Sequence, residues 1–220
     1  MNMIEPIIRP QTFKDLAYSE IRYLLTTGSI KAAEIITANQ FAGMLKVSRT
    51  PVREALLQLA SEGFLVAKDG RGFMIRQFSE KEIRDFFEVR RMVEVHVIEQ
   101  LVGRLGAPDF NEMDEMLLMM KQRAEEQDSS GFLEADKDFH MDLVHRYNNS
   151  LLITITEQIR TLIAILGLKA LATSGRIQRV LEEHAHIVEG FREKNVQSAV
   201  KAMVNHLNTT EKEILKNLGT

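Results

Sequence analysis

The chain has 220 residues, a length that suits one or two domains, each able to bury its own hydrophobic core. Apolar residues make up 45% and charged residues 27% of the chain, which excludes a wholly disordered protein. Cysteine is absent, and its absence excludes disulfides, thiolate catalysis and cysteine-ligated metal sites.

No segment is typical of a targeting signal or a membrane span. Residues 1–10 carry Glu5 and Arg9 within a short apolar stretch, unlike a signal peptide. The most apolar window, residues 151–172, is interrupted by three charged side chains. We therefore expect a soluble, cytoplasmic protein without a membrane partner.

Charge is distributed unevenly along the chain. Residues 1–76 carry 10 Lys and Arg against 7 Asp and Glu, whereas residues 77–220 carry 18 against 24. A mildly basic N-terminal part thus precedes an acidic remainder, although the net charge is −3. We expect two domains with different partners, spanning residues 1–76 and 81–220 and joined by a linker at residues 77–80.

Start and stop signals in the N-terminal part predict three helices. A capping-box pattern followed by apolar helical spacing predicts a helix over residues 12–28, where a glycine ends it. A second box predicts a short helix over residues 37–45. Ser48 can cap a third helix over residues 48–62, because proline is tolerated in its first turn.

A β-hairpin follows these helices. Two apolar runs, residues 64–67 and 73–76, flank a Lys-Asp-Gly-Arg-Gly sequence. Asp69-Gly70 between apolar runs is typical of a hairpin with a type I′ turn, which needs positive φ at both central residues. Three helices followed by a two-stranded hairpin describe a winged helix-turn-helix, a fold that binds DNA.

The remainder of the chain has a helical pattern to its end. Six helices are expected, near residues 79–103, 109–127, 130–147, 150–171, 176–193 and 196–217. Short connections between them predict an antiparallel all-α bundle whose interior can hold a ligand. The fold class is therefore mainly α.

The third helix carries the side chains best suited to read DNA. Arg49 and Arg53 are four residues apart near its N-terminus, and arginine can contact guanine O6 and N7 bidentately in the major groove. The alternative is a solvated helix face with Arg53 paired to a nearby glutamate. Four further residues could contact the DNA backbone or minor groove: Ser48, Thr50, Lys68 and Arg71.

The string Ser-Arg-Thr-Pro-Val-Arg-Glu-Ala-Leu over residues 48–56, followed by Glu62-Gly63 and Gly70-Arg71-Gly72, closely resembles the GntR family of bacterial transcription regulators. The resemblance implies that Arg49 and Arg53 contact operator bases and that Gly72 lets the hairpin approach DNA. Lys46 stands where the family usually has glycine, and a left-handed backbone there costs a non-glycine residue about 1–2 kcal/mol.

Histidine and aspartate spacing in the C-terminal part suggests a metal site. Asp136 and His140 are four residues apart and share one helix face. His184 and His206 lie about equally far from the short turn between the last two helices, so their rings fall at similar heights. Three histidines and one carboxylate suit zinc or nickel, with manganese or iron as alternatives. The competing interpretation is that these are ordinary surface or core groups.

Several neighbouring residues offer alternative ligands: Asp138, Asp142, Glu183 and His186. Asp138 and His186 are poorer candidates, because each lies two residues from a preferred histidine and faces away on a helix.

The C-terminal part also resembles the FCD effector domain of the FadR branch of this family. The matching segments are residues 87–94, Asp136 to His140, Asn149, Glu183-His184 and Asn205 to Leu207. The resemblance implies that the metal ligands are Asp136, His140, His184 and His206. Six helices rather than seven are similar to the VanR-type subgroup.

Arg90 lies on an otherwise apolar stripe of the first of these helices, which also holds Glu94. A charge that faces a core must be paired or must hold a ligand. Arg90 therefore either pairs with Glu94 or clamps the carboxylate of an effector at the metal.

Together these features predict a homodimeric transcription regulator. Its winged domains bind a two-fold operator, and its bundle binds a divalent metal and a small organic acid that alters operator affinity. Two alternatives remain: a metal-dependent hydrolase or lyase fused to a DNA-binding head, and a metal-stapled repressor without an effector.

Overall fold

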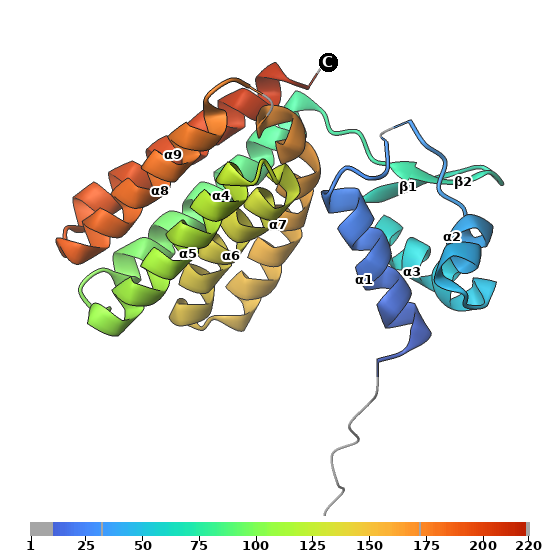
Figure 1. Cartoon of the computed structure of the whole chain (residues 1–220), viewed down its shortest axis with the longest axis horizontal. Coiled ribbons are helices and arrows are strands. Elements are labelled where there is room, and N and C mark those ends of the chain that lie inside the picture. The colour runs from blue at the N-terminus through green and yellow to red at the C-terminus, as the bar shows by residue number, and fades with distance from the viewer. Residues whose placement is uncertain (1–10, 32, 172, 219–220) are drawn as a thin grey trace, which may run out of the picture. The chain divides into compact units, whose positions relative to one another are not determined.

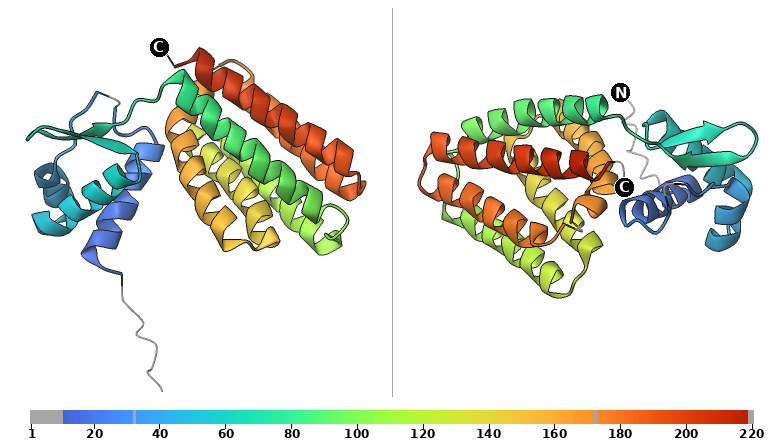
Figure 2. Two further views of the ribbon diagram at one scale, coloured as in Figure 1. Left: turned by 180° about the vertical axis from the view of Figure 1, so that it is seen from behind. Right: turned by 90° about the horizontal axis from the view of Figure 1, so that it is seen from above.

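The structure is a computed structural model, and it describes residues 11–31, 33–171 and 173–218. The residues 1–10 considered above as a signal segment lie outside the described residues. The chain divides into two compact units, one ending at Gln77 and one beginning at Phe78 (Figures 1 and 2). Each unit has its own core and is described by itself.

The first unit contains three helices and a hairpin: α1 (Phe13–Thr26), α2 (Ala38–Leu45), α3 (Arg49–Ser61), β1 (Leu65–Lys68) and β2 (Gly72–Ile75). Its core lies where α1 packs on α3, around the fully buried side chains of Ile21, Val52 and Leu56. This winged helix-turn-helix agrees with the prediction.

The predicted caps hold in part. Thr12 forms the complete capping box with Asp15. Thr37 accepts a bond from the Gln40 amide at the start of α2. Ser48 occupies the N-cap of α3 as predicted, but its side chain makes no capping hydrogen bond.

The hairpin turn differs from the type I′ turn that we expected. Three residues separate the paired Lys68 and Gly72, and the Arg71 amide donates to the Lys68 carbonyl at 2.8 Å. Gly70 has φ of +65°, but Asp69 does not have positive φ. A turn with positive φ only at its second central residue is of the type II kind, in which glycine is required only there. The sequence signal located the turn correctly but not its type.

The second strand of the hairpin is also tied to the loop before α2. Phe73 and Ile36 exchange two backbone hydrogen bonds, of 2.7 and 2.8 Å. A Cβ on Gly72, whose φ is +129°, would stand 2.4 Å from the Ile36 carbonyl oxygen. Glycine at position 72 is therefore required by the packing of the hairpin within the unit itself.

The second unit is a bundle of six helices within the described residues: α4 (Glu80–Leu101), α5 (Ala107–Glu125), α6 (Ser129–Tyr147), α7 (Ser150–Leu171), α8 (Arg176–Arg192) and α9 (Val196–Lys216). Each agrees with its predicted range to within about two residues at either end. Helix α9 packs between α8 and α4 (Figure 2, right), while α6 packs against α5, α7 and α4. This arrangement directs one face of α4, α6, α7, α8 and α9 toward a shared interior.

Helix α7 is the most apolar element, and residues Ser150–Leu168 are long and apolar enough to cross a membrane by length and composition alone. Its Arg160 is nevertheless buried and forms an ion pair with Asp136 of α6. Helix α7 has a buried, paired charge in its middle and packs on α6. Both features are typical of a core helix in a bundle.

Candidate functional site

The arginines predicted to read DNA lie together with the hairpin. Arg49 and Arg53 share the exposed face of α3 and line an open groove whose other wall is the tip of the hairpin. Lys68, Arg71 and Gly72 line the same groove. Within the described residues, neither Arg49 nor Arg53 forms an ion pair, so the alternative of an Arg53–glutamate pair is not realised.

Ser48 and Thr50 are exposed at the start of α3, but they do not line this groove. Residues that the sequence did not single out do line it, namely Thr37, Ala38 and Asn39 at the N-terminus of α2. A helix N-terminus presents free backbone N–H groups that suit a phosphate, so these residues extend the cationic groove. In the sequence, these groove residues are marked only by the N-cap motif that predicts the start of α2.

The turn between α2 and α3 is strained at Lys46, as expected from a lysine at a position where the GntR family usually has glycine. Lys46 has φ of +54° and ψ of +40°, the left-handed conformation that glycine adopts at no cost. The Lys46 amide donates to the Ala42 carbonyl and closes α2. The turn thus keeps its geometry despite the lysine.

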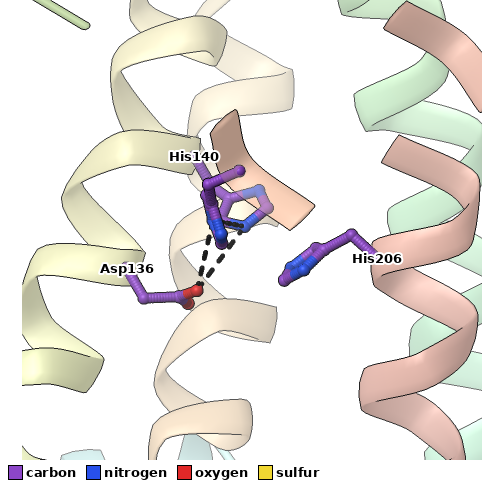
Figure 3. A group of neighbouring side chains, drawn as sticks. Asp136, His140 and His206 are labelled. Atoms are coloured by element: carbon purple, nitrogen blue, oxygen red, sulfur yellow. Dashed lines mark hydrogen bonds and ion pairs between the residues drawn. The ribbon is translucent and has the colours of Figure 1, made fainter. Parts of the chain in front are cut away.

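Four side chains of the second unit converge in its interior. Asp136 and His140 come from α6, His184 from α8 and His206 from α9, and all four are buried. One ligand atom of each lies within 4.8 Å of those of the others. Figure 3 shows Asp136 and His206 approaching from opposite sides, with the ring of His140 between them.

Each imidazole in this cluster is oriented by a hydrogen-bond acceptor on its outer nitrogen, Nδ1. The three pairs are His140 with Glu94 Oε2 at 2.5 Å, His184 with the Val180 carbonyl at 2.8 Å and His206 with Glu183 Oε2 at 2.8 Å. An acceptor at Nδ1 places the proton of a neutral ring there, so the lone pair is at Nε2. All three rings are thereby prepared to ligate through Nε2.

Burial and neighbouring charges set the protonation of the cluster. Burial lowers the pKa of His140 to about 4, an effect that Glu94 only partly offsets. Burial and the adjacent His206 hold the pKa of His184 well below its ordinary value. Burial alone would raise the pKa of Asp136, but Arg160 and the histidines hold it well below its ordinary value. At neutral pH the cluster therefore contains neutral imidazoles of His140 and His184 beside a carboxylate.

The donor set fits a divalent cation. Nε2 of His140 and Nε2 of His184 are 3.2 Å apart, and Asp136 Oδ1 is 3.3 Å from His184 Nε2. With both rings protonated at Nδ1, these atoms are lone pairs that face each other in a buried interior. A cation among them offsets this repulsion, and three imidazoles with one carboxylate suit zinc, nickel, manganese or iron(II).

The competing ligands lie elsewhere. Asp138 and His186 are exposed, and Asp142 pairs with Arg146. Glu183 is close to the cluster, but both its oxygens are engaged by Arg176, and one also accepts from His206. Burial alone would raise the pKa of Glu183, but His206 and Arg176 lower it, so it remains a charged support for the His206 ring.

Arg90 forms the pair with Glu94 that its sequence position allowed. Its Nε donates to Glu94 Oε1 at 2.7 Å, while Glu94 Oε2 holds His140. Both of its Nη nitrogens, however, are buried and have no hydrogen-bond partner in the described part of the chain. The pair with Glu94 therefore occupies one edge of the guanidinium and leaves the other edge available.

Sequence reasoning missed a second buried arginine. Arg160 of α7 is 2% exposed, and its Nη2 bonds Asp136 Oδ2, on the opposite side of that carboxylate from the histidines. Its Nε and Nη1 have no hydrogen-bond partner among residues 11–31, 33–171 and 173–218. The signal was a lone charge in the most apolar window of the chain, which only the packed bundle places beside the cluster.

Comparisons with known proteins agree with both units. Residues 14–75 match the bacterial regulatory proteins of the gntR family, and residues 85–209 match the FCD domain. The gluconate operon transcriptional repressor of Bacillus licheniformis is 27% identical over 190 residues, which cover 84% of this chain and 77% of that protein.

Solved structures show the same fold. McbR/YncC of E. coli has a TM-score of 0.82 at 20% identity, covering 94% of this chain and 99% of that one. The metal-free FCD domain of TM0439 has a TM-score of 0.56 at 23% identity, covering 66% of this chain and 99% of that one. The chain therefore belongs to the GntR family of bacterial transcription regulators and carries the FCD domain of its FadR-type branch.

Proposed function

We propose that this regulator binds operator DNA with an affinity set by a small carboxylate effector, held at a divalent metal in the helical bundle. One observation carries the proposal. Three imidazoles whose Nδ1 atoms have acceptors converge on one carboxylate in a buried interior, beside an arginine edge that has no partner.

On the DNA side, Arg49 and Arg53 contact base edges in the major groove, and Lys68 and Arg71 contact the backbone from the hairpin. The protein acts in the cytoplasm as a homodimer, because two copies of the winged domain read the halves of a two-fold site. Repression is the favoured sign of regulation, since the gluconate operon relative is named as a repressor.

In the bundle, the ligands of the metal are Asp136, His140, His184 and His206. Zinc or nickel is the favoured ion, with manganese or iron as alternatives. When bound, the ion supplies a Lewis-acidic position for an acid oxygen. Arg90 holds the effector through its free Nη edge, because a guanidinium matches a carboxylate with two parallel bonds.

The alternative of a hydrolase or lyase has less support. A general base would need a free carboxylate or imidazole beside the cluster, but Glu183 is engaged by Arg176 and His206, and His186 is exposed. The alternative of a metal-stapled repressor without effector leaves the unpartnered nitrogens of Arg90 without a role.

The metal site is tested by thermal unfolding and elemental analysis. A bound ion stabilises the native state by mass action, so chelation should lower the melting temperature of the purified chain. His184→Ala should remove most of that sensitivity and the bound metal. His186→Ala is the matched control, because it removes an exposed imidazole from the same helix and should leave both unchanged.

Native protein that contains no divalent metal and shows no shift on metal addition would refute the site. A metal-loaded protein whose operator affinity no carboxylate alters would instead support the metal-stapled repressor.

A further inference from the structure

Five polar atoms of the helices α4 and α7 are buried and have no hydrogen-bond partner within the described residues. They are Arg90 Nη1 and Nη2, Arg160 Nε and Nη1, and Thr156 Oγ1. Arg90 is 1% exposed and Arg160 and Thr156 are each 2% exposed. An unpaired buried donor costs about 1–3 kcal/mol, and more when it is charged, so a group of them calls for an acceptor.

The positions of these donors link them to one place. Arg160 bonds Asp136, and Arg90 bonds Glu94, which in turn holds His140. Arg160 of α7 is therefore anchored on a residue of the metal cluster, and Arg90 of α4 on the carboxylate that orients one of its histidines. The helices α4 and α7 contact each other. Thr156 lies one turn before Arg160 on the same face of α7.

The balance of buried charges also favours an acidic ligand at this place. Arg90 and Arg160 offset Glu94 and Asp136, and Arg176 offsets Glu183. An imidazole that binds a metal through Nε2 adds no charge, so a divalent ion in the cluster leaves two uncompensated positive charges in a buried interior. A ligand with a single carboxylate neutralises only one of them, and unpaired buried charge is strongly unfavourable.

The number of acceptors leads to the same requirement. A single carboxylate has two oxygens. It cannot both reach the metal and satisfy four guanidinium nitrogens and a hydroxyl. A second acidic group supplies the missing oxygens, and guanidiniums bind carboxylate and phosphate alike.

We propose that Arg90, Thr156 and Arg160 form a second-acid subsite and that the effector carries two acidic groups, one directed at the metal and one, a carboxylate or a phosphate, held by these donors. This inference rests on the proposed function and narrows it from small acids in general to dianions.

Matched acids test the proposal by calorimetry on the zinc-loaded full chain. The pairs are malate with 2-hydroxybutanoate, 2-oxoglutarate with 2-oxopentanoate, and 3-phosphoglycerate with glycerate. The members of each pair share the metal-binding end, and only the first carries a second acidic group. At least one dianion should bind tenfold or more tightly than its partner, and the third pair distinguishes phosphate from carboxylate.

Variants assign any such preference to the donors. Arg160→Met should lower the preference at least fivefold and Thr156→Val about twofold, while affinity for the monoanion changes little. Arg160→Lys keeps the charge but not the planar guanidinium, so its preference for the dianion should lie between those of the wild type and Arg160→Met. The control is Arg179→Met, because Arg179 is an exposed arginine of the same unit that pairs with Glu213. Zinc content is measured for each variant.

If Arg160→Met loses zinc or fails to fold, Arg160→Lys and Thr156→Val carry the test alone. The inference is overturned if no pair shows more than a threefold preference, or if the preference survives in these variants, since the donors are then satisfied by water. Acids that bind equally within pairs and still shift operator affinity would overturn the dianion inference and leave the proposed function intact. A dianion preference without any change in operator affinity would support the second-acid subsite and overturn the proposed function.

Discussion

At the scale of single residues, the proposed DNA-reading role falls on Arg49 and Arg53, whose side chains are exposed and form no ion pair among the described residues. Arg49→Ala or Arg53→Ala should each cost about 1–3 kcal/mol of specific binding, because each removes a contact to a base edge. Discrimination between operator and scrambled DNA should fall in a competition titration, while binding to scrambled DNA changes little. Equal losses on both DNAs would assign these arginines to the phosphate backbone instead.

A second residue-scale prediction concerns the contact between α1 and α3. The Tyr18 hydroxyl donates to Glu62 Oε2 at 2.6 Å, and burial together with this carboxylate raises the pKa of Tyr18 to about 12. As the pH rises, the Tyr18 hydroxyl thus keeps its proton to a higher pH in the folded state than in the unfolded state. The stability from this contact is complete below about pH 10 and is lost as the pH rises through 12.

The comparison of the wild-type chain with Tyr18→Phe measures that contribution. The wild type should melt at a higher temperature at pH 8, and the difference should shrink between pH 10 and 12. A difference that stays constant over this range would show that the ionisation of Tyr18 is not coupled to folding.

Residue spacing suggested the four side chains that cluster, because the α-helical period places Asp136 and His140 on one face and the short α8–α9 turn aligns His184 with His206, and the resemblance to the FCD domain favoured them over the neighbouring alternatives. It was not sufficient for Arg160 and Thr156. Their burial depends on how α7 packs on α6 and α4, and in the sequence Arg160 only interrupts an apolar run. Among the acceptors that orient the histidines, the Val180 carbonyl belongs to the backbone and leaves no side-chain signal.

At the scale of elements, helix boundaries followed closely from periodicity and caps, since both are local. The type of the hairpin turn could not be predicted in this way, because it depends on backbone angles, and Asp69-Gly70 permits more than one combination of them. The extra bridge between Ile36 and Phe73 joins segments far apart in the sequence and carries no local pattern.

The turn between α2 and α3 should improve with glycine. Lys46→Gly relieves the left-handed strain and should stabilise the chain by about 1 kcal/mol, read as a higher midpoint in urea unfolding. Lys201→Gly, in the middle of α9, should destabilise it by a similar amount, because helix-interior glycine loses backbone entropy. If both changes destabilise, the strain at position 46 is absent in solution.

The crossing of α8 and α9, which brings His184 beside His206, depends on a glycine. A Cβ on Gly190 would lie 2.6 Å from the backbone of Ala199. Gly190→Ala should therefore force the helices apart, costing about 1–3 kcal/mol, and should weaken metal binding in a zinc competition assay. Gly43→Ala meets open space in α2 and should be neutral or slightly stabilising. Unchanged zinc affinity in Gly190→Ala would separate the helix crossing from the cluster geometry.

At the scale of the whole molecule, the chain combines a DNA-binding unit with a bundle that gathers charge in its interior. An effector acts only through different affinities for the arrangements that can and cannot bind DNA, so effector affinity and operator affinity must change by the same factor. Coupling of 1–3 kcal/mol, usual for such linkage, corresponds to a change of about 5–150-fold.

The most direct test is an operator titration of the full chain with and without a saturating carboxylate effector, performed on zinc-loaded and on chelated protein. The acid should shift operator affinity at least fivefold when zinc is present, and chelation or Arg90→Ala should abolish the shift. An equal shift in zinc-loaded and chelated protein would contradict the central role of the metal cluster.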